Sequence, residues 1–321
     1  MEKFESFLIS YDIAFEKQVD LRKKTWIHRG GIADFFVVPS NVEQLKEVIN
    51  FLYNNDIRFL LVGCTSNLYI KNTTNIPVVV STLKCNQYVL KDSFITCDCG
   101  LQVSRLAGSM IDAGIKGFEY LTKLPGTVAA AIYNNSSVKK TENSITNLLI
   151  DLELLTPNGI LTLSPTDLHL GFRTSDLKSN QLTGVILRCR LRAEKGDKET
   201  MLLKAKVSEE ERNRLLEGPA NNLGCTVHKM YCNGQMPKRY KVPYRLFSKV
   251  ASLVLDGNKL KRAQKNFLLI ISGNHKLMPY VSDKQLITFI WRDERADAMF
   301  DDYLKFMRDV CKTDKVEIEI I

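Results

Sequence analysis

The segment GIKGFEYLTKLPGTVAAAIYNN, residues 114–135, carries the strongest structural signal in the sequence. At its centre, Pro125-Gly126-Thr127 predicts a turn, because proline fixes φ, glycine accepts a positive φ and threonine can cap a following helix. The small apolar residues 128–132 come next, and they let a second backbone or a flat ligand approach closely. The stretch therefore predicts either a buried turn facing a phosphate or cofactor, or a tightly packed helix–turn of any α/β protein.

Two amphipathic helices are predicted on the N-terminal side of this turn. One covers Val103–Ala113, with Gly114 as its stop, and the other covers Val42–Asn54, with Ser40 as N-cap and Glu43 three residues later. The apolar face of the first consists of Val103, Leu106, Ala107, Met110 and Ile111. That of the second consists of Val42, Leu45, Val48, Ile49 and Leu52.

The remaining pattern alternates strands and turns, and begins with a βαβ-like unit. Strands are predicted at 35–38, 58–62, 68–70, 78–80, 87–90, 94–98, 148–155, 160–163, 184–191 and 316–321, with a hairpin turn at Pro157-Asn158-Gly159. A linker is predicted at 192–198, and helices at 199–215 and 293–311. We expect an N-terminal segment 1–23, a domain 24–194 with subdomains of about 24–81 and 82–194, and a C-terminal domain 195–321.

Composition is that of an ordinary globular protein, with 45% apolar and 25% charged residues among 321. The net charge of +9 is spread along the chain, and aromatic residues do not interleave with the basic ones, so small anionic ligands are favoured over nucleic acid. Eight cysteines and four histidines show no metal-ligand spacing, and no metal site is predicted. Without a signal pattern or a run that could span a bilayer, we expect a cytoplasmic protein with reduced thiols and no membrane partner.

Several glycine turns stand next to strands, where backbone N–H groups can point together at phosphate oxygens. None of them is followed by the Gly-Lys-Ser/Thr of a phosphate-binding P-loop. None opens a helix as G-x-G-x-x-G, so the common dinucleotide fingerprint is absent too. The pattern therefore indicates a less common type of nucleotide-binding loop.

Three of these turns occur in a recognisable order. They are Gly30-Gly31-x-Ala33, Gly63-x-x-Ser66-Asn67-Leu68, and Gly114-x-x-Gly117-x-Glu119-x-Leu121-x-x-x-Pro125-Gly126-Thr127; Asn135 continues the third, and Phe172-Arg173-Thr174-Ser175 follows. Over residues 24–191 this set resembles the FAD-binding half of the UDP-N-acetylenolpyruvoylglucosamine reductase (MurB) family, of the vanillyl-alcohol-oxidase-like type. The resemblance implies an α+β architecture, a two-subdomain FAD-binding PCMH-type fold with a C-terminal α/β substrate domain.

The resemblance also implies a reaction. NADPH would reduce FAD, and the flavin would deliver hydride to the enolpyruvyl ether of UDP-N-acetylglucosamine, a step of peptidoglycan precursor synthesis. NADH in place of NADPH stays open. The implied cofactor-binding residues are Gly30, Gly31, Gly63, Cys64, Thr65, Ser66, Asn67, Leu68, Pro125, Gly126, Thr127 and Asn135.

Three catalytic residues follow from the same resemblance. Arg173 matches the arginine that stabilises an enolate-like intermediate, and Cys225, after Gly224, matches the residue that protonates it. An ordinary thiol pKa of about 8.5 keeps Cys225 protonated near neutral pH, although a small buried cysteine is the alternative interpretation. Glu319 matches the terminal carboxylate, with Glu317 as the competing register.

The chain departs from the family pattern at several places. Ala129-Ala130-Ala131 stands for Gly-Gly-Ala, Cys64-Thr65 replaces two glycines, and the segments 135–140, 227–230 and 274–277 have lost the expected residues. Extra methyl groups could obstruct the cofactor wherever the backbone needs glycine. Two alternatives therefore stay open: a flavoprotein that acts on another sugar nucleotide, and a non-catalytic paralogue that has lost FAD.

Overall fold

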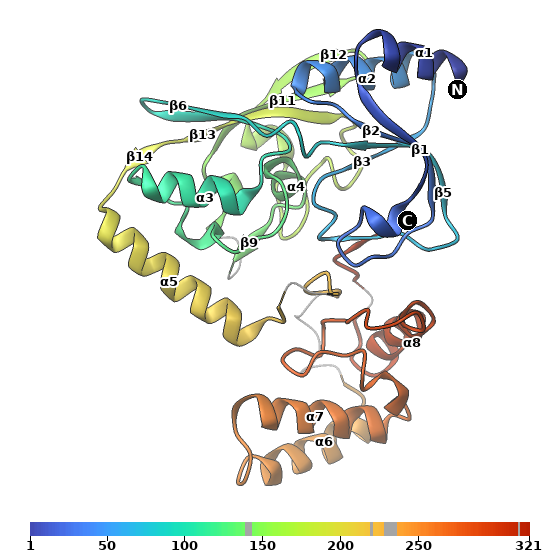
Figure 1. Ribbon diagram of the computed structural model, residues 1–321. Coiled ribbons are helices and arrows are strands. Elements are labelled where there is room, and N and C mark those ends of the chain that lie inside the picture. The colour runs from blue at the N-terminus through green and yellow to red at the C-terminus, as the bar shows by residue number, and fades with distance from the viewer. Residues whose placement is uncertain (139–142, 219–220, 228–235, 314) are drawn as a thin grey trace. The chain divides into compact units, whose positions relative to one another are not determined.

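The computed structural model describes residues 1–138, 143–218, 221–227, 236–313 and 315–321 (Figure 1). Parts of two family departures predicted above, residues 139–140 and 228–230, lie outside this range. The chain forms two compact units. Unit 1 consists of residues 1–21, 31–65 and 73–210, and unit 2 consists of 22–30, 66–72 and 211–321.

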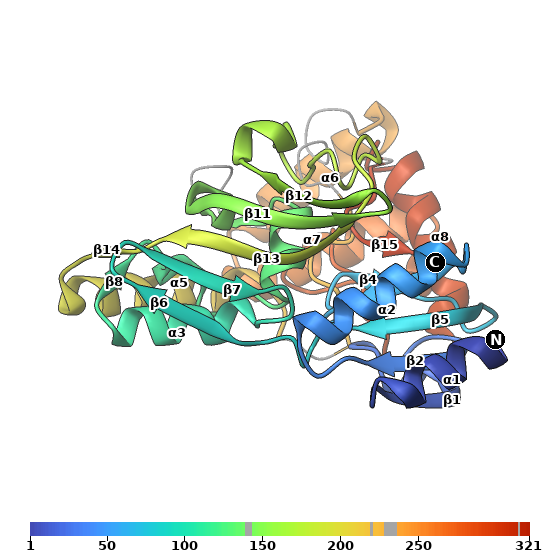
Figure 2. The same ribbon diagram turned by 90° about the horizontal axis from the view of Figure 1, so that it is seen from above.

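The first sheet of unit 1 has four strands. Its order is β1 (Ala14–Asp20), β2 (Ile32–Val38), β5 (Asn75–Ser81) and β3 (Phe59–Val62). The last three are mutually parallel and β1 is antiparallel to β2 (Figure 2). Helix α1 (Glu2–Ser10) precedes β1, and α2 (Val42–Asn54) links β2 to β3. The predicted βαβ-like unit is therefore present, with β5 inserted between its two strands.

Helix α2 has the predicted limits, and its five predicted apolar residues are all buried. The predicted cap was wrong by one residue. Asn41 is the N-cap, and its Oδ1 accepts the Gln44 N–H at 2.9 Å. Ser40 instead donates its own N–H to Gln44 Oε1. Serine and asparagine are comparable caps, so local composition alone could not choose between neighbours.

The second sheet of unit 1 has five antiparallel strands. In order they are β12 (Gly159–Leu163), β11 (Leu149–Thr156), β13 (Val185–Arg192), β7 (Phe94–Asp98) and β6 (Tyr88–Lys91). A tight turn joins β11 to β12, as predicted. Helix α3 (Val103–Asp112) follows β7 and buries the five residues of its predicted face; Gly114 beyond it has φ +73°. Helix α4 (Val128–Tyr133) starts directly after the Pro-Gly-Thr turn.

The two faces of β13 belong to two different hydrophobic clusters. Val185 and Leu187 join α1, α2 and the first sheet in one cluster. Cys189 and Leu191 join α3, α4, β7 and β11 in the other. A register shift between Glu153 and Leu154 of β11 accompanies this change of side. The third motif is thus packed into the core of the five-stranded sheet.

The described residues of unit 1 also include several short elements. They are the 3₁₀ turns η1 (Leu21–Lys23, which runs into unit 2), η2 (Glu119–Leu121), η4 (Ile145–Asn147) and η5 (Pro165–Leu168), the pair β8 (Ile115–Lys116) with β14 (Glu194–Lys195), and the pair β9 (Ser137–Val138) with β10 (Asn143–Ser144). The predicted linker at 192–198 was wrong in part, because β14 pairs antiparallel with β8. Helix α5 (Lys198–Leu215) then runs from unit 1 into unit 2.

Unit 2 combines helices with one short parallel strand pair. Its helices are α6 (Lys238–Ala251), α7 (Gly257–Ile271), the 3₁₀ turn η7 (His275–Leu277) and α8 (Ala296–Asp309), and its strands are β4 (Leu68–Tyr69) and β15 (Glu319–Ile320). Phe289, Trp291 and Phe300 form the centre of its core. Helix α8 is shorter than predicted because Asp293 occupies the preceding turn, where its carboxylate accepts the Arg295 N–H. The predicted terminal strand is reduced to β15.

Candidate functional site

The Pro125-Gly126-Thr127 turn is held rigidly at the start of α4. Thr127 is buried, and its Oγ1 accepts the Ala130 N–H as the N-cap of the helix. Gly126 has φ +111°, which glycine adopts without strain. Its carbonyl accepts the Val103 N–H at 3.1 Å, and Val128 N–H donates to Leu101 at 2.8 Å. The turn is therefore fixed between the start of α3 and the start of α4.

The second glycine motif meets the third at this turn. Gly63 follows β3, and a Cβ atom on it would lie 2.8 Å from Thr127 Oγ1. Burial raises the pKa of the Cys64 thiol, and a hydrogen bond from the Gly126 backbone partly offsets that rise. Thr65 holds φ +53°, a conformation unusual for a β-branched residue and natural for glycine. Gly63–Thr65 and Pro125–Thr127 thus form one contiguous group within unit 1.

The backbone at the alanine triplet has a conformation that does not require glycine. Ala129, Ala130 and Ala131 lie in α4, and none of them has a positive φ. Ala131 is buried in the cluster of the five-stranded sheet, while Ala129 contacts both clusters of unit 1. The additional methyl groups are therefore accommodated by helix formation and packing.

Asn135 fixes the loop that carries Arg173. Its Nδ2 donates to the Gly171 carbonyl at 2.7 Å, while its Oδ1 accepts hydrogen bonds from Ser144 and Thr146, both at 2.7 Å. Ser175 Oγ donates to the carbonyl of Tyr133 at the end of α4. These contacts tie residues 171–175 to the far end of the same helix that the Pro-Gly-Thr turn begins.

Arg173 itself has φ +55°, and its guanidinium carbon lies 5.9 Å from the centre of the Phe172 ring. A positive φ is uncommon at a residue other than glycine, although ten other such residues of the described chain share it. The structure places Arg173 in unit 1, whereas Cys225 and Glu319 belong to unit 2. Their roles stay predictions.

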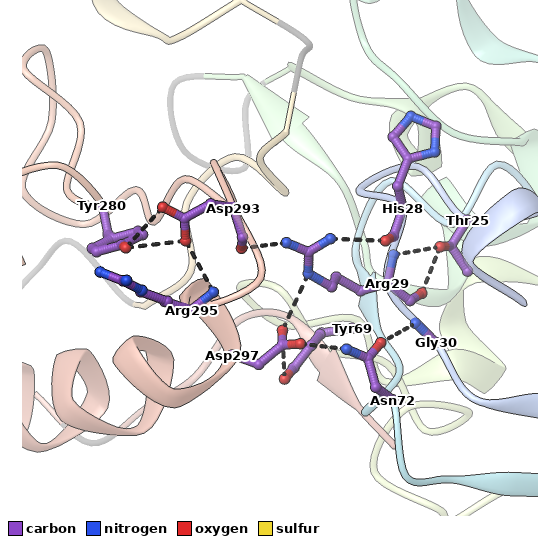
Figure 3. A network of polar contacts seen from close by, with 10 residues as sticks. All are labelled: Thr25, His28, Arg29, Gly30, Tyr69, Asn72, Tyr280, Asp293, Arg295 and Asp297. Carbon is purple, nitrogen blue, oxygen red and sulfur yellow. Dashed lines mark hydrogen bonds and ion pairs between the residues drawn. The ribbon is translucent and has the colours of Figure 1, made fainter.

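The first glycine motif contributes to both units. A Cβ atom on Gly31 would lie 1.7 Å from the Thr74 carbonyl oxygen, so only glycine fits there in unit 1. In unit 2, the Gly30 N–H donates to Asn72 Oδ1 at 3.0 Å, and Asn72 Nδ2 donates to Asp297 Oδ2 at 2.6 Å (Figure 3). Gly30 is thereby connected to the first turn of α8.

Asp297 is the centre of a polar network that the sequence did not predict. Its carboxylate accepts the Tyr69 hydroxyl at 3.1 Å and lies 3.4 Å from Arg29 Nε (Figure 3). Burial raises the pKa of Asp297, even though the Arg29 guanidinium and the Tyr69 hydrogen bond act in the opposite direction. The only sequence signal was the place of Arg29, directly before Gly30-Gly31.

Unit 2 also brings together three segments that carry predicted site residues. The Glu319 N–H donates to the Asn67 carbonyl at 2.9 Å, and Asn67 Nδ2 donates to the Glu317 carbonyl at 3.2 Å. The Glu317 N–H in turn donates to the carbonyl of Thr226, which follows Cys225. Asn67, the Cys225 segment and the 317–319 segment are therefore neighbours within unit 2.

The side chains of these segments are only partly exposed. Cys225 Sγ lies 3.6 Å from Gln285 Oε1. Glu319 Oε1 is shielded from solvent, and Glu319, unlike Glu317, lies within a strand. Because β15 begins at residue 319, strand alternation does not relate the two glutamates. Glu319 stays the predicted residue, with Glu317 as the competing register.

Among the residues that the structure describes, no group of three or more His, Cys, Asp or Glu side chains is placed to hold a metal ion. No helix in the same part of the chain is long and apolar enough to cross a bilayer.

Comparisons with known proteins show that much of unit 1 is similar to FAD-binding proteins. Residues 33–164 match the FAD binding domain family. UDP-N-acetylenolpyruvoylglucosamine reductase of Caldicellulosiruptor saccharolyticus is 29% identical over 181 residues, which cover 56% of this chain and 58% of that protein. The Bacillus subtilis enzyme of the same name is 28% identical over 184 residues, covering 57% of this chain and 60% of that one. The chain thus spans about three fifths of the length of these relatives.

A solved structure extends the likeness in fold. UDP-N-acetylenolpyruvylglucosamine reductase (MurB) from Thermus caldophilus superimposes with a TM-score of 0.67 over 96% of this chain and 99% of that one, at 17% identity. The predicted resemblance to the MurB family and the predicted α+β FAD-binding fold are therefore confirmed.

Proposed function

We propose that this chain is a FAD-dependent reductase that uses NADPH to reduce the enolpyruvyl ether of UDP-N-acetylglucosamine to UDP-N-acetylmuramate. One observation carries the proposal: two glycine motifs, separated by about sixty residues, meet at Gly63 and Thr127 inside a domain that matches the FAD binding domain family. The names of the relatives supply the substrate.

The residues at this junction fit a bound flavin. Gly63 lets the loop after β3 pack directly on the Thr127 side chain, and the alanines that replace glycines lie in a helix where their methyl groups are accommodated. FAD would supply hydride transfer there. Gly30, Gly31, the segment 63–68, the turn 125–127 and Asn135 would hold it.

Three residues would act on the substrate. Arg173 would stabilise negative charge that develops beside the substrate carboxylate, as a fixed guanidinium does in other enzymes. Cys225 would donate a proton to the carbon that has not received hydride. Glu319 would support the same charged intermediate, as the family resemblance implies.

The test separates the proposed steps. The purified protein is examined by visible absorption, then reduced anaerobically with NADPH, then mixed with enolpyruvyl-UDP-N-acetylglucosamine. We expect flavin absorption bands in the visible spectrum, bleaching of these bands by NADPH, and their recovery when the enolpyruvyl substrate is added.

Other outcomes contradict different parts of the proposal. A protein that bleaches with NADPH but is not reoxidised by this substrate would be a flavoprotein for another sugar nucleotide. A colourless protein that cannot be reconstituted with FAD would be a paralogue that kept the fold and lost the cofactor. Thr65, with a β-branched side chain at positive φ, is the local feature that favours this last reading.

A further inference from the structure

Helix α6 exposes an apolar stripe to solvent. The stripe, called here the α6 stripe, consists of Val242, Leu246, Val250 and, just beyond the helix end, Leu253; all four are exposed, Leu246 by 66%, Val250 by 58% and Leu253 by 81%. Spacings of four, four and three residues place such side chains along one side of a helix. Exposed apolar side chains that are contiguous in this way mark interaction surfaces more often than scattered ones do.

The stripe is separate from the face that α6 uses for folding. Phe247 stacks on Phe267 of α7, with ring centres 4.1 Å apart and an interplanar angle of 3°. Tyr240 and Tyr244 pack against the core of unit 2, and Ala251 is buried. The helix therefore already has an apolar inner face, and the stripe is a second one that this packing does not use.

Basic residues run beside the stripe. Lys238, Lys241, Arg245 and Lys249 follow one another at spacings of three, four and four residues, one row away from the stripe. Residues 238–261, which include the α6–α7 turn, contain seven basic residues and a single acidic one, Asp256. The next two basic residues of α7, Arg262 and the buried Lys265, pair with Asp283. Charged and apolar side chains are thus combined on the hairpin of α6 and α7, whose two helices Figure 1 labels.

We propose that the α6 stripe and its basic row dock this protein on an anionic lipid surface. A helix with an apolar strip, a Lys/Arg-rich flank and no capacity to span a bilayer can lie in the headgroup region, where the apolar residues insert and the cations meet lipid phosphates. The expectation of no membrane partner was based on the lack of a spanning run, which a surface-lying helix does not need.

The same features disfavour other binding partners for the α6 stripe. A second copy of this chain would bring one basic row against another, and like charges in an interface oppose association. Single-stranded nucleic acid prefers aromatic platforms, and the α6 stripe contains only aliphatic residues. An acidic protein partner would share the charge argument, and the experiment tells it apart from lipid.

The experiment uses the full chain and sedimentation with vesicles. We expect binding to vesicles of phosphatidylcholine mixed with phosphatidylglycerol, and little binding to phosphatidylcholine alone. Raising the salt from about 0.1 M to about 1 M shortens the Debye length from about 10 Å to about 3 Å, and should release most of the bound protein. Absence of binding to the anionic vesicles would overturn the proposal and leave an acidic protein as the candidate partner.

A matched pair of variants tests the place of contact. Leu246→Glu with Val250→Glu changes the stripe, and Leu203→Glu with Val207→Glu makes the same change on exposed positions of α5, where Leu203 is 64% and Val207 52% exposed. We expect the first pair to weaken vesicle binding at least about tenfold and the second to leave it unchanged. Equal effects of the two pairs would contradict the proposal.

Charge reversal gives a second, independent readout. Arg245→Glu with Lys249→Glu should also weaken binding at least about tenfold, because each basic residue near an anionic surface strengthens binding about fivefold. Circular dichroism melts of every variant identify any that fail to fold. Gel filtration adds a further check: a dimer that dissociates when Leu246 and Val250 are changed, without vesicle binding by the parent, would assign the stripe to self-association and overturn the lipid proposal.

Discussion

Gly63 packs against Thr127 so closely that a side chain at position 63 would overlap the cap of helix α4. The Cβ atom would lie 2.8 Å from Thr127 Oγ1 and 2.9 Å from its Cγ2. Thr127 cannot turn away without giving up its hydrogen bond to the Ala130 N–H. The contact therefore couples the loop after β3 to the turn before α4.

The substitution Gly63→Ala tests this coupling. We expect it to lower the free energy of unfolding by about 1–3 kcal/mol, the usual cost of overpacking a dense site, and to lower the flavin content of the purified protein. Urea unfolding and the visible spectrum provide the two measurements. Gly108→Ala is the control, because nothing lies within 4 Å of a Cβ there and the site is inside α3; it should gain about 0.5–1 kcal/mol. Similar stability changes in both variants would disprove the steric argument.

The variant Asp297→Ala tests the network around Gly30. It removes the partner of Arg29, Tyr69 and Asn72 at once, and we expect a loss of about 1–3 kcal/mol because these polar groups are partly buried. Thermal and urea denaturation measure it. Asp302→Ala, an exposed position on the same helix, should change stability by less than about 0.5 kcal/mol. If Asp297→Ala were as stable as the parent, the network would make no net contribution to the stability of the fold.

A pH-dependent ion pair joins His169 and Asp176, the residues that flank the Arg173 loop on either side in the sequence. His169 Nδ1 lies 2.6 Å from Asp176 Oδ2, and this hydrogen bond raises the pKa of His169 above its ordinary value of 6.5. Since the folded pKa exceeds the unfolded one, the pair contributes stability that is fully present below about pH 6.5 and is lost as the pH rises through the folded pKa.

Proton NMR titration of the imidazole measures this effect directly. We expect the His169 midpoint to lie above 6.5 in the parent and to fall toward 6.5 in Asp176→Asn. His169→Gln assigns the resonance among the four histidines of the chain. A midpoint that does not respond to Asp176→Asn would show that the pair does not form in solution.

The proposed role of Cys225 predicts a split between two half-reactions. Cys225→Ala should leave flavin reduction by NADPH unchanged and slow reoxidation by the enolpyruvyl substrate about 10²–10⁴-fold, the usual contribution of a positioned proton donor. Cys225→Ser should keep most of the activity, since a hydroxyl can also donate. Stopped-flow absorption separates the two steps.

Cys311→Ala is the matched control for this substitution. Cys311 is buried in the core of the same unit, so its loss should affect stability and leave both half-reactions unchanged. A normal reoxidation rate in Cys225→Ala would mean that Cys225 is a structural cysteine, the alternative that the sequence left open.

The sequence predicted most of unit 1 because its signals are local. The apolar faces of α2 and α3 follow from spacing within one helix, and Thr127 as the cap of α4 follows from its place after Pro125-Gly126. Ser40 and Asn41 are both suitable as the N-cap of α2, and the local sequence alone could not decide between them.

Long-range polar contacts were beyond prediction from the sequence. Arg29 and Asp297 are 268 positions apart, and neither belongs to a motif that indicates its partner. The start of α8 and the short β15 depend equally on contacts between segments, namely the hydrogen bond from the Tyr280 hydroxyl to the Asp293 carboxylate before α8 and the pairing of β15 with Leu68 and Tyr69. Such features require the packed structure, because intrinsic propensity is a weak guide at the ends of elements.

The pairing of β4 with β15 has a consequence for synthesis on the ribosome. Unit 1 is complete in the chain at residue 210, whereas β4, made early, receives its partner strand only at residues 319–320. At bacterial or eukaryotic elongation rates, residues 211–321 take on the order of 5–20 s to be made. During that interval the segments 22–30 and 66–72 emerge as two loops whose buried side chains, Ile27 and Tyr69 among them, have no core to enter. Nascent chains of this protein should therefore pass through a stage in which unit 1 is folded and these two loops still expose apolar side chains. At that stage, the exposed side chains would be binding sites for a chaperone.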